Sequence, residues 1–221
     1  MASRMNLAPS IEKVNFARII SLLIDGGQLA LCHQFDQHFP PSCLANGLRK
    51  AEIRKTLVDL RGKGKLNDMQ WKRLYPPMKG PPVSSENFDI SLLLCLLRNI
   101  CGLKPPKTGW DNPPSPRDVS TVADIVRIRL LQNELQHLPA ASMADQDFQT
   151  KWHEMESILT RLGSGIPHFT DSIRKLKYDS WDPDKRKEDE DAILKKKDSD
   201  KVVIDRIDDT DLRTSIIENK K

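Results

Sequence analysis

The chain has 221 residues, of which 38% are hydrophobic and 30% are charged, and its mean hydropathy is -0.52. This length suits one sizeable core with a tail rather than two full domains. No apolar run approaches the roughly 18 residues that a membrane span needs. The apolar stretch 19–24 also lacks a following small-residue cleavage site. We therefore expect a soluble, cytoplasmic protein.

Helical periodicity is visible along the first half of the chain, whereas the alternation typical of strands is not. Ser10 is placed to cap a helix that begins at Ile11, and residues 25–27 (Asp-Gly-Gly) are expected to kink or break that helix. Prolines at 40–41 end it. Further helices are predicted, in chain order, over residues 42–62, 68–74 and 88–100.

The predicted helix 88–100 is apolar on nearly all sides, so we expect it at the centre of the fold. Five prolines keep the following segment, 104–117, out of regular structure. Apolar residues then recur with helical spacing over 125–138 and 148–162, and Gly163 marks the end of the second of these helices.

The sequence therefore predicts an all-α helical bundle. We place the helical domain over residues 11–163 and an extra helix within 164–182. Residues 183–221 hold 11 Lys/Arg and 12 Asp/Glu in alternating blocks with few apolar anchors. Such a tract is typical of a disordered tail or a solvated helix.

The cysteines and histidines form no recognisable disulfide or metal pattern. No pair of cysteines has C-x2-C spacing, and no histidines form an H-E-x-x-H motif. We expect reduced, buried thiols, no metal and no cofactor. Residues 1–182 hold 24 Lys/Arg and 19 Asp/Glu, a mild excess that permits contact with nucleic acid without indicating it.

A polar group on the predicted helix before Pro139 has the composition of a site. It combines cations, amides and an imidazole: Arg127, Arg129, Gln132, Asn133, Glu134 and His137. Arg129, Asn133 and His137 are spaced by four residues and share a helix face. Imidazole moves a proton near neutral pH, and guanidinium and amide groups hold phosphate oxygens. The pattern fits a metal-independent phosphodiester site, but the polar face of any surface helix also fits it.

Several motifs occur in an order that resembles one family. They are Phe88-Asp89-Ile90-Ser91, Gly109-Trp110-Asp111, Ala123-Asp124-Ile125-Val126-Arg127 and Asn133-Glu134 followed by His137. Together they resemble the HEPN domain (higher eukaryotes and prokaryotes nucleotide-binding). The branch is the one found in the DAZ-interacting zinc-finger (DZIP-type) ubiquitin ligase and in invertebrate immune-type proteins. The resemblance covers roughly residues 14–163.

The resemblance implies a helical bundle that commonly dimerises. HEPN ribonucleases use an arginine, a polar residue and a histidine to cleave RNA without metal, in a cleft shared by two protomers. Here Asn133 matches the polar position and His137 the histidine, but Gln132 stands at the arginine position. Glutamine cannot neutralise a phosphate, and losing such a stabiliser costs on the order of 10²–10³ in rate. Positions 132 and 137 point about 140° apart on an ideal helix, so a second protomer would help them converge.

Two functions remain open, beside a third and smaller alternative, a truncated fragment whose effector domain lies elsewhere. The favoured one is a cytoplasmic, homodimeric interaction module with a signalling protein partner, contact with RNA through Arg127 and Arg129, no membrane association and no full nuclease activity. The alternative is a metal-independent endoribonuclease with a composite dimer active site, in which His137 is the acid/base, Asn133 orients it, and Arg129 or Gln132 holds the phosphate. No RING-type Cys-His set is present, so we do not expect ubiquitin transfer by this chain alone.

Overall fold

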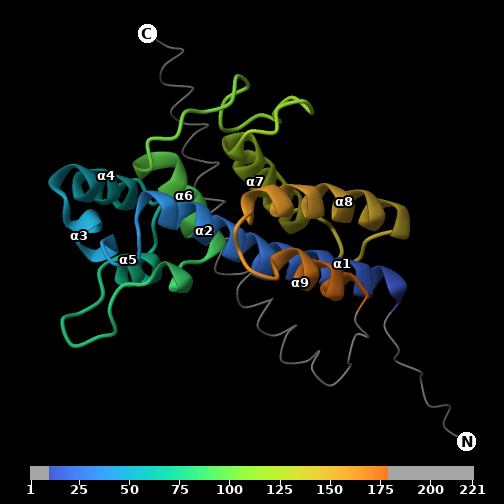
Figure 1. Cartoon of the computed structure of the whole chain (residues 1–221), viewed down its shortest axis with the longest axis horizontal. Coiled ribbons are helices and arrows are strands. Elements are labelled where there is room, and N and C mark those ends of the chain that lie inside the picture. Colours follow the sequence, from blue (N-terminus) through green and yellow to red (C-terminus); the bar gives the residue numbers. More distant parts are fainter. Residues whose placement is uncertain (1–9, 179–221) are drawn as a thin grey trace, which may run out of the picture.

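A computed structural model describes residues 10–178 of the chain, so the predicted tail, 183–221, lies outside the described residues. Within these residues the secondary structure is helical and no strand is present, which confirms the all-α prediction. A long helix formed by α1, η1 and α2 runs along the molecule, with the helices of residues 44–74 at one end and those of residues 145–178 at the other (Figure 1). Its parts are α1 (Ile11–Ser21), η1 (Leu22–Gly27) and α2 (Gln28–His38).

The predicted break at residues 25–27 is wrong, because the helix continues through them from Ile11 to His38. The segment η1 is a π-helix, in which each turn is wider than in an α-helix but the hydrogen-bonded helix does not end. A Cβ atom added to Gly26 would lie 3.0 Å from the Cδ1 atom of Leu159. The glycine therefore allows α8 (Asp145–Leu162) to pack closely against η1, and does not act as a helix stop.

By length and composition alone, this continuous helix is able to cross a membrane. It spans 28 residues, and its most apolar window has a mean hydropathy of 1.3. Half of that window is buried inside the fold, and the core helix of a soluble protein passes the same test. The helix thus carries no conclusion about membranes, and the expected lack of membrane association stays a prediction.

The helix α6 (Ile90–Ile100) lies in the core, as its apolar sequence predicts. Its side chains from Ile90 to Leu94, and those of Leu96 and Leu97, are buried. The side chain of Asp89 caps its N-terminus by accepting a hydrogen bond from the N–H of Leu92 at 2.8 Å. The helix packs against α2 along the middle of the molecule.

The predicted helix 42–62 is divided into α3 (Leu44–Arg49) and α4 (Ala51–Gly62), because Lys50 adopts an extended ψ of 135°.

The next helix, α5 (Asp68–Leu74), has the predicted bounds, and Asn67 and Gln70 form a capping box at its start. Gln70 and Arg73 both bind the carboxylate of Asp89, which ties α5 to the beginning of α6. We call residues 44–79, which contain α3–α5, the basic arm, for their lysines and arginines.

The remaining helices are α7 (Thr121–Gln136), α8 and α9 (Phe169–Tyr178), with the short 3-10 helix η2 (Ser85–Asn87) before α6. Residues 104–117 contain no helix or strand, as their prolines predict. The helix α9 lies within the segment 164–182, where an extra helix is expected. Gly163 ends α8, and a Cβ atom there would meet the ring of Phe169 at 2.2 Å.

Candidate functional site at the C-terminal half of α7

Gln132, at the arginine position of the resemblance, lies in the interior of the protein. Its side chain is 4% exposed, and its Nε2 donates a hydrogen bond to the Oγ of Ser91 on α6 at 3.2 Å. A buried amide is stable only when it is hydrogen-bonded, so this contact fixes the side chain toward α6. Gln132 therefore points into the fold and not toward a solvent-accessible cleft.

Arg127 is held by a buried carboxylate at the start of α7. Asp124 is fully buried, and its Oδ1 accepts from Arg127 at 2.7 Å and from Arg161 on α8 at 2.8 Å. The Nε of Arg161 donates to the other oxygen at 2.6 Å. This hydrogen bond raises the pKa of Arg161 above its ordinary value. A second donor group of Arg127 reaches the carbonyl oxygen of Ser115, 2.8 Å away, so its guanidinium is already engaged.

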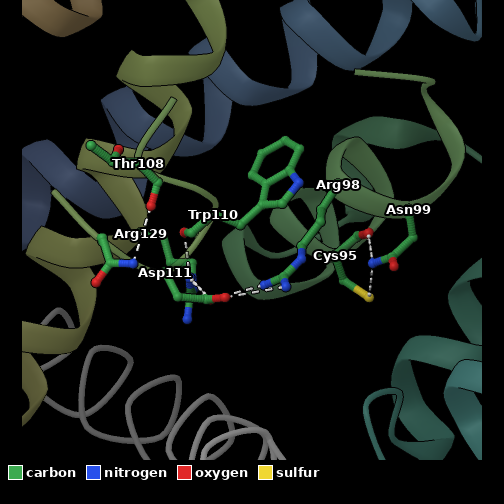
Figure 2. A network of polar contacts seen from close by, with 8 residues as sticks. Cys95, Arg98, Asn99, Thr108, Trp110, Asp111 and Arg129 are labelled. Carbon is green, nitrogen blue, oxygen red and sulfur yellow. Dashed lines mark hydrogen bonds and ion pairs between the residues drawn. The ribbon is translucent and has the colours of Figure 1, made fainter. Parts of the chain in front are cut away.

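Arg129 is likewise bound by a carboxylate, which belongs to the proline-rich segment of residues 104–117. Figure 2 shows the carboxylate of Asp111 between Arg129 and Arg98, with Trp110 beside them. Arg129 donates to Asp111 at 2.5 Å and to the carbonyl oxygen of Trp110 at 2.7 Å, and Arg98 donates to Asp111 at 3.1 Å. Partial burial raises the pKa of Asp111, but the charges and hydrogen bonds of Arg129 and Arg98 outweigh this effect, so the pKa lies below its ordinary value.

Asn133 and His137 lie at the end of α7. His137 is exposed at the C-cap, and its backbone N–H lies 3.2 Å from the carbonyl oxygens of Asn133 and Glu134. Asn133 is half-buried. Since Gln132 faces α6 while His137 faces solvent, the structure does not bring these two side chains together within one chain. The arginines on the same helix are turned toward Asp124 and Asp111.

A small cavity of about 230 Å³ opens beside this group, between the prolines of residues 113–116 and helices α7 and α8. Its lining includes Arg127, but also Glu134 and Glu154 with several aliphatic side chains. The negative charges of these two carboxylates repel a phosphate, so the cavity is not suited to binding RNA. Within residues 10–178, no cluster of three His, Cys, Asp or Glu side chains is arranged to hold a metal ion.

Five residues hold this region together: Ser91, Arg98, Asp111, Asp124 and Arg161. The motifs of the sequence contained Ser91, Asp111 and Asp124 without assigning them a role, and sequence reasoning also missed the roles of Arg98 and Arg161. One signal for the burial of Gln132 was present. Positions 125, 128, 132 and 135 step by 3, 4 and 3, which places the glutamine on the stripe of Ile125, Ile128 and Leu135, all buried. Leu131, which belongs to the apolar spacing predicted over residues 125–138, is only partly buried.

The helical fold and the motifs around α7 define a HEPN-type domain. The chain belongs to the DZIP3/hRUL138-like HEPN family, whose sequence model matches residues 41–189. That range begins after the long helix α1–α2, although Leu22, Leu31 and Phe35 of this helix are part of the core.

The chain is also similar to curated proteins. It is 30% identical over 151 residues to the E3 ubiquitin-protein ligase DZIP3 of Homo sapiens, and equally to that of Mus musculus. The alignment covers 67% of this chain and 12% of each relative, so the chain corresponds to a small part of those proteins. No solved structure matches the chain significantly.

Proposed function

We propose that this chain is a HEPN-type interaction module without full nuclease activity, and that it forms a homodimer and binds a signalling protein in the cytoplasm. The observation that supports it most is the position of Gln132. The residue at the motif's arginine position is neutral, buried and bonded to Ser91. Phosphodiester cleavage needs a cation preorganised at the developing charge, and Gln132 supplies none.

The neighbouring cations do not replace the missing arginine. Arg127 is bound to Asp124 and Arg129 to Asp111, at 2.7 and 2.5 Å. A phosphate would have to displace one of these carboxylates before either guanidinium became available. The same pairing weakens the case for RNA contact through Arg127 and Arg129, which we expect to contribute little. In the relatives, the equivalent stretch is a small part of a protein named as a ubiquitin ligase, which agrees with a module that connects rather than catalyses.

The nuclease alternative is tested directly. The purified chain is incubated with a fluorescent single-stranded RNA in the presence of EDTA, beside the variants His137→Ala and Gln132→Arg. We expect no cleavage by the wild type, because the site lacks a free cation. Cleavage by the wild type that is lost in His137→Ala would establish the enzyme instead. Circular dichroism monitors Gln132→Arg, since an arginine at this buried position has no carboxylate partner among the contacts of Gln132.

The dimer is tested by size-exclusion chromatography with light scattering over a range of protein concentrations. We expect twice the monomer mass at high concentration. A strict monomer at every concentration would remove both the dimer and the composite cleft that the nuclease alternative requires.

A further inference from the structure

The positive charge of the described protein is concentrated in the basic arm. Residues 49–79 hold ten Lys/Arg and three Asp/Glu, a net charge of +7. The rest of residues 10–178 hold 13 Lys/Arg and 14 Asp/Glu, a net charge of -1. The arm therefore creates a local positive field that the overall charge of +4 conceals.

Most of these cations are exposed and have no ion-pair partner among the residues that the structure describes: Arg49, Lys50, Lys55, Lys63, Lys72 and Lys79. On α4, successive residues turn by about 100°, which puts Arg54 and Arg61 on one exposed flank and Lys55 nearer to Glu52 and Asp59 on another. Arg61 is paired with Asp68, so it is the exposed cations without a carboxylate partner that are suited to a negatively charged partner.

A cavity of about 550 Å³ lies where the arm meets the end of α2 and the end of α6. Its wall is largely apolar and includes Phe39, Pro40, Ile53, Ile100 and Cys101, with Lys50 at the start of α4. Burial raises the pKa of Cys101 to about 12, so its thiol is neutral at physiological pH and forms part of the apolar wall.

The wall of this cavity is rigidly built. The ring of Phe39 stacks on that of Phe35 with centroids 5.2 Å apart. A Cβ atom on Gly47 would lie 2.8 Å from the Phe39 ring, so the glycine lets α3 pack directly on it. A preformed apolar cavity lowers the ordering cost of a side chain that enters it.

The N-terminus of α4 adjoins the cavity. Lys50 is the N-cap of α4 and makes no side-chain capping bond, which leaves the first N–H groups of this 12-residue helix without a side-chain acceptor from the cap. The helix dipole adds partial positive charge at the same place. Glu52 also lines the cavity, so carboxylates of a partner are favoured on the side of Arg49 and Lys50.

Two other anionic partners fit these observations less well. Single-stranded nucleic acid usually stacks its bases on open aromatic faces. Here Arg61 covers the Trp71 ring at 4.8 Å, Arg54 lies 5.9 Å from the Tyr75 centroid, and the Tyr75 hydroxyl donates to the carbonyl oxygen of Leu48. A membrane surface requires a broad apolar face. The large apolar side chains exposed on the arm do not form a continuous face: they are Val58, Met69 and Met78.

We propose that this cavity and the cations around it bind an acidic protein segment that carries a bulky apolar side chain. The apolar side chain enters the cavity between Phe39, Ile53 and Ile100, and the flanking carboxylates lie against Arg49, Lys50 and the start of α4. The inference rests on the proposed role as an interaction module and specifies the chemistry of its partner.

The test measures binding of a short fluorescent peptide to the full chain by anisotropy. In this peptide, aspartates and glutamates flank a central pair of leucines. We expect Lys50→Glu to weaken binding by about tenfold or more, because it reverses the charge at the N-terminus of α4. Ile53→Ala removes part of the apolar wall and is expected to weaken binding by about fivefold. Circular dichroism verifies that both variants are folded.

Two matched controls separate a site from general attraction. Lys13→Glu makes the same charge change on α1, at the other end of the molecule, and is expected to alter binding by less than about twofold. A peptide with serines in place of the leucines is expected to bind about tenfold more weakly, since it loses the buried apolar area. Equal effects of Lys13→Glu and Lys50→Glu, or equal binding of the serine peptide, would overturn the proposal.

Binding of a single-stranded RNA but not of the acidic peptide would also overturn it and would assign the arm to nucleic acid. The outcome is independent of the nuclease and light-scattering assays, which do not use this surface. Failure of the peptide to bind with no RNA cleavage would reject the partner and leave the non-catalytic role intact. RNA cleavage by the wild type would reject that role whatever the peptide does.

Discussion

The basic arm and the α7–α8 region differ in what their cationic side chains contact. In the α7–α8 region, Arg98, Arg127, Arg129 and Arg161 each bind a carboxylate, and the acceptors Asp111 and Asp124 each serve two of them. In the arm, lysines such as Lys55 and Lys63 are exposed and have no ion-pair partner among the described residues. The arginines near the HEPN-like motif of α7 are thus structural, and the exposed cations without a carboxylate partner lie in the basic arm.

The difference follows from burial. Asp124 is fully buried, and a buried carboxylate requires cations and hydrogen bonds around it. In the arm, the corresponding pair of Arg61 and Asp68 is exposed, with side chains 44% and 80% accessible. An exposed pair is screened by water and contributes little, so the surrounding lysines are under no constraint to be paired.

The largest expected effect is that of Asp124→Asn. This variant keeps the shape of the side chain but removes the charge that holds Arg127 and Arg161. Leaving buried partners uncompensated typically costs about 3–5 kcal/mol, and we expect about 3 kcal/mol because Arg161 is partly exposed and can reach water. Urea denaturation followed by circular dichroism measures the free energy of unfolding.

Asp68→Asn in the arm is the control for this substitution. It removes the same charge from an exposed pair and is expected to cost less than about 1 kcal/mol. Similar losses in the two variants would contradict the difference between the regions.

The second expected effect compares two glycines that end helices. Gly163→Ala places a Cβ atom 2.2 Å from the ring of Phe169, and overpacking of this kind costs about 1–3 kcal/mol. Gly62→Ala at the end of α4 meets nothing within 4 Å. There the loss of backbone freedom in the unfolded chain makes the change neutral or stabilising by up to about 1 kcal/mol. Thermal unfolding distinguishes them, and a destabilised Gly62→Ala would show that the arm is packed more tightly than the structure indicates.

Local signals in the sequence were sufficient for much of the fold. The apolar stripe of α8 predicts its helix, because a period of 3.6 residues depends only on neighbours in the chain. The glycines of η1 misled for the same reason. Their local preference is to end a helix, whereas the role of Gly26 is set by Leu159, which is distant in sequence.

The candidate site was less predictable, because its contacts join distant segments. Gln132 meets Ser91 across 41 positions, and Arg129 meets Asp111 across 18. The spacing of polar residues along α7 shows which side chains share a face, but not which carboxylate will approach them. The family resemblance identified Gln132 as the altered position, and only the structure shows that it is buried.

The smallest expected effect is that of Asp111→Asn, which tests how firmly the proline-rich segment is attached to α7. Asp111 is about half-exposed, so losing its pairs with Arg98 and Arg129 should cost about 1 kcal/mol or less near pH 7. The pKa of Asp111 is lowered in the fold, so its contribution is present above the unfolded value of about 3.9 and is lost as the pH falls through the folded value. The melting temperatures of the wild type and Asp111→Asn should therefore differ at pH 7 and converge in acid. A difference that persists below both pKa values would mean that the carboxylate stabilises the segment by packing and not by charge, and that Arg129 is less firmly held than its contacts indicate.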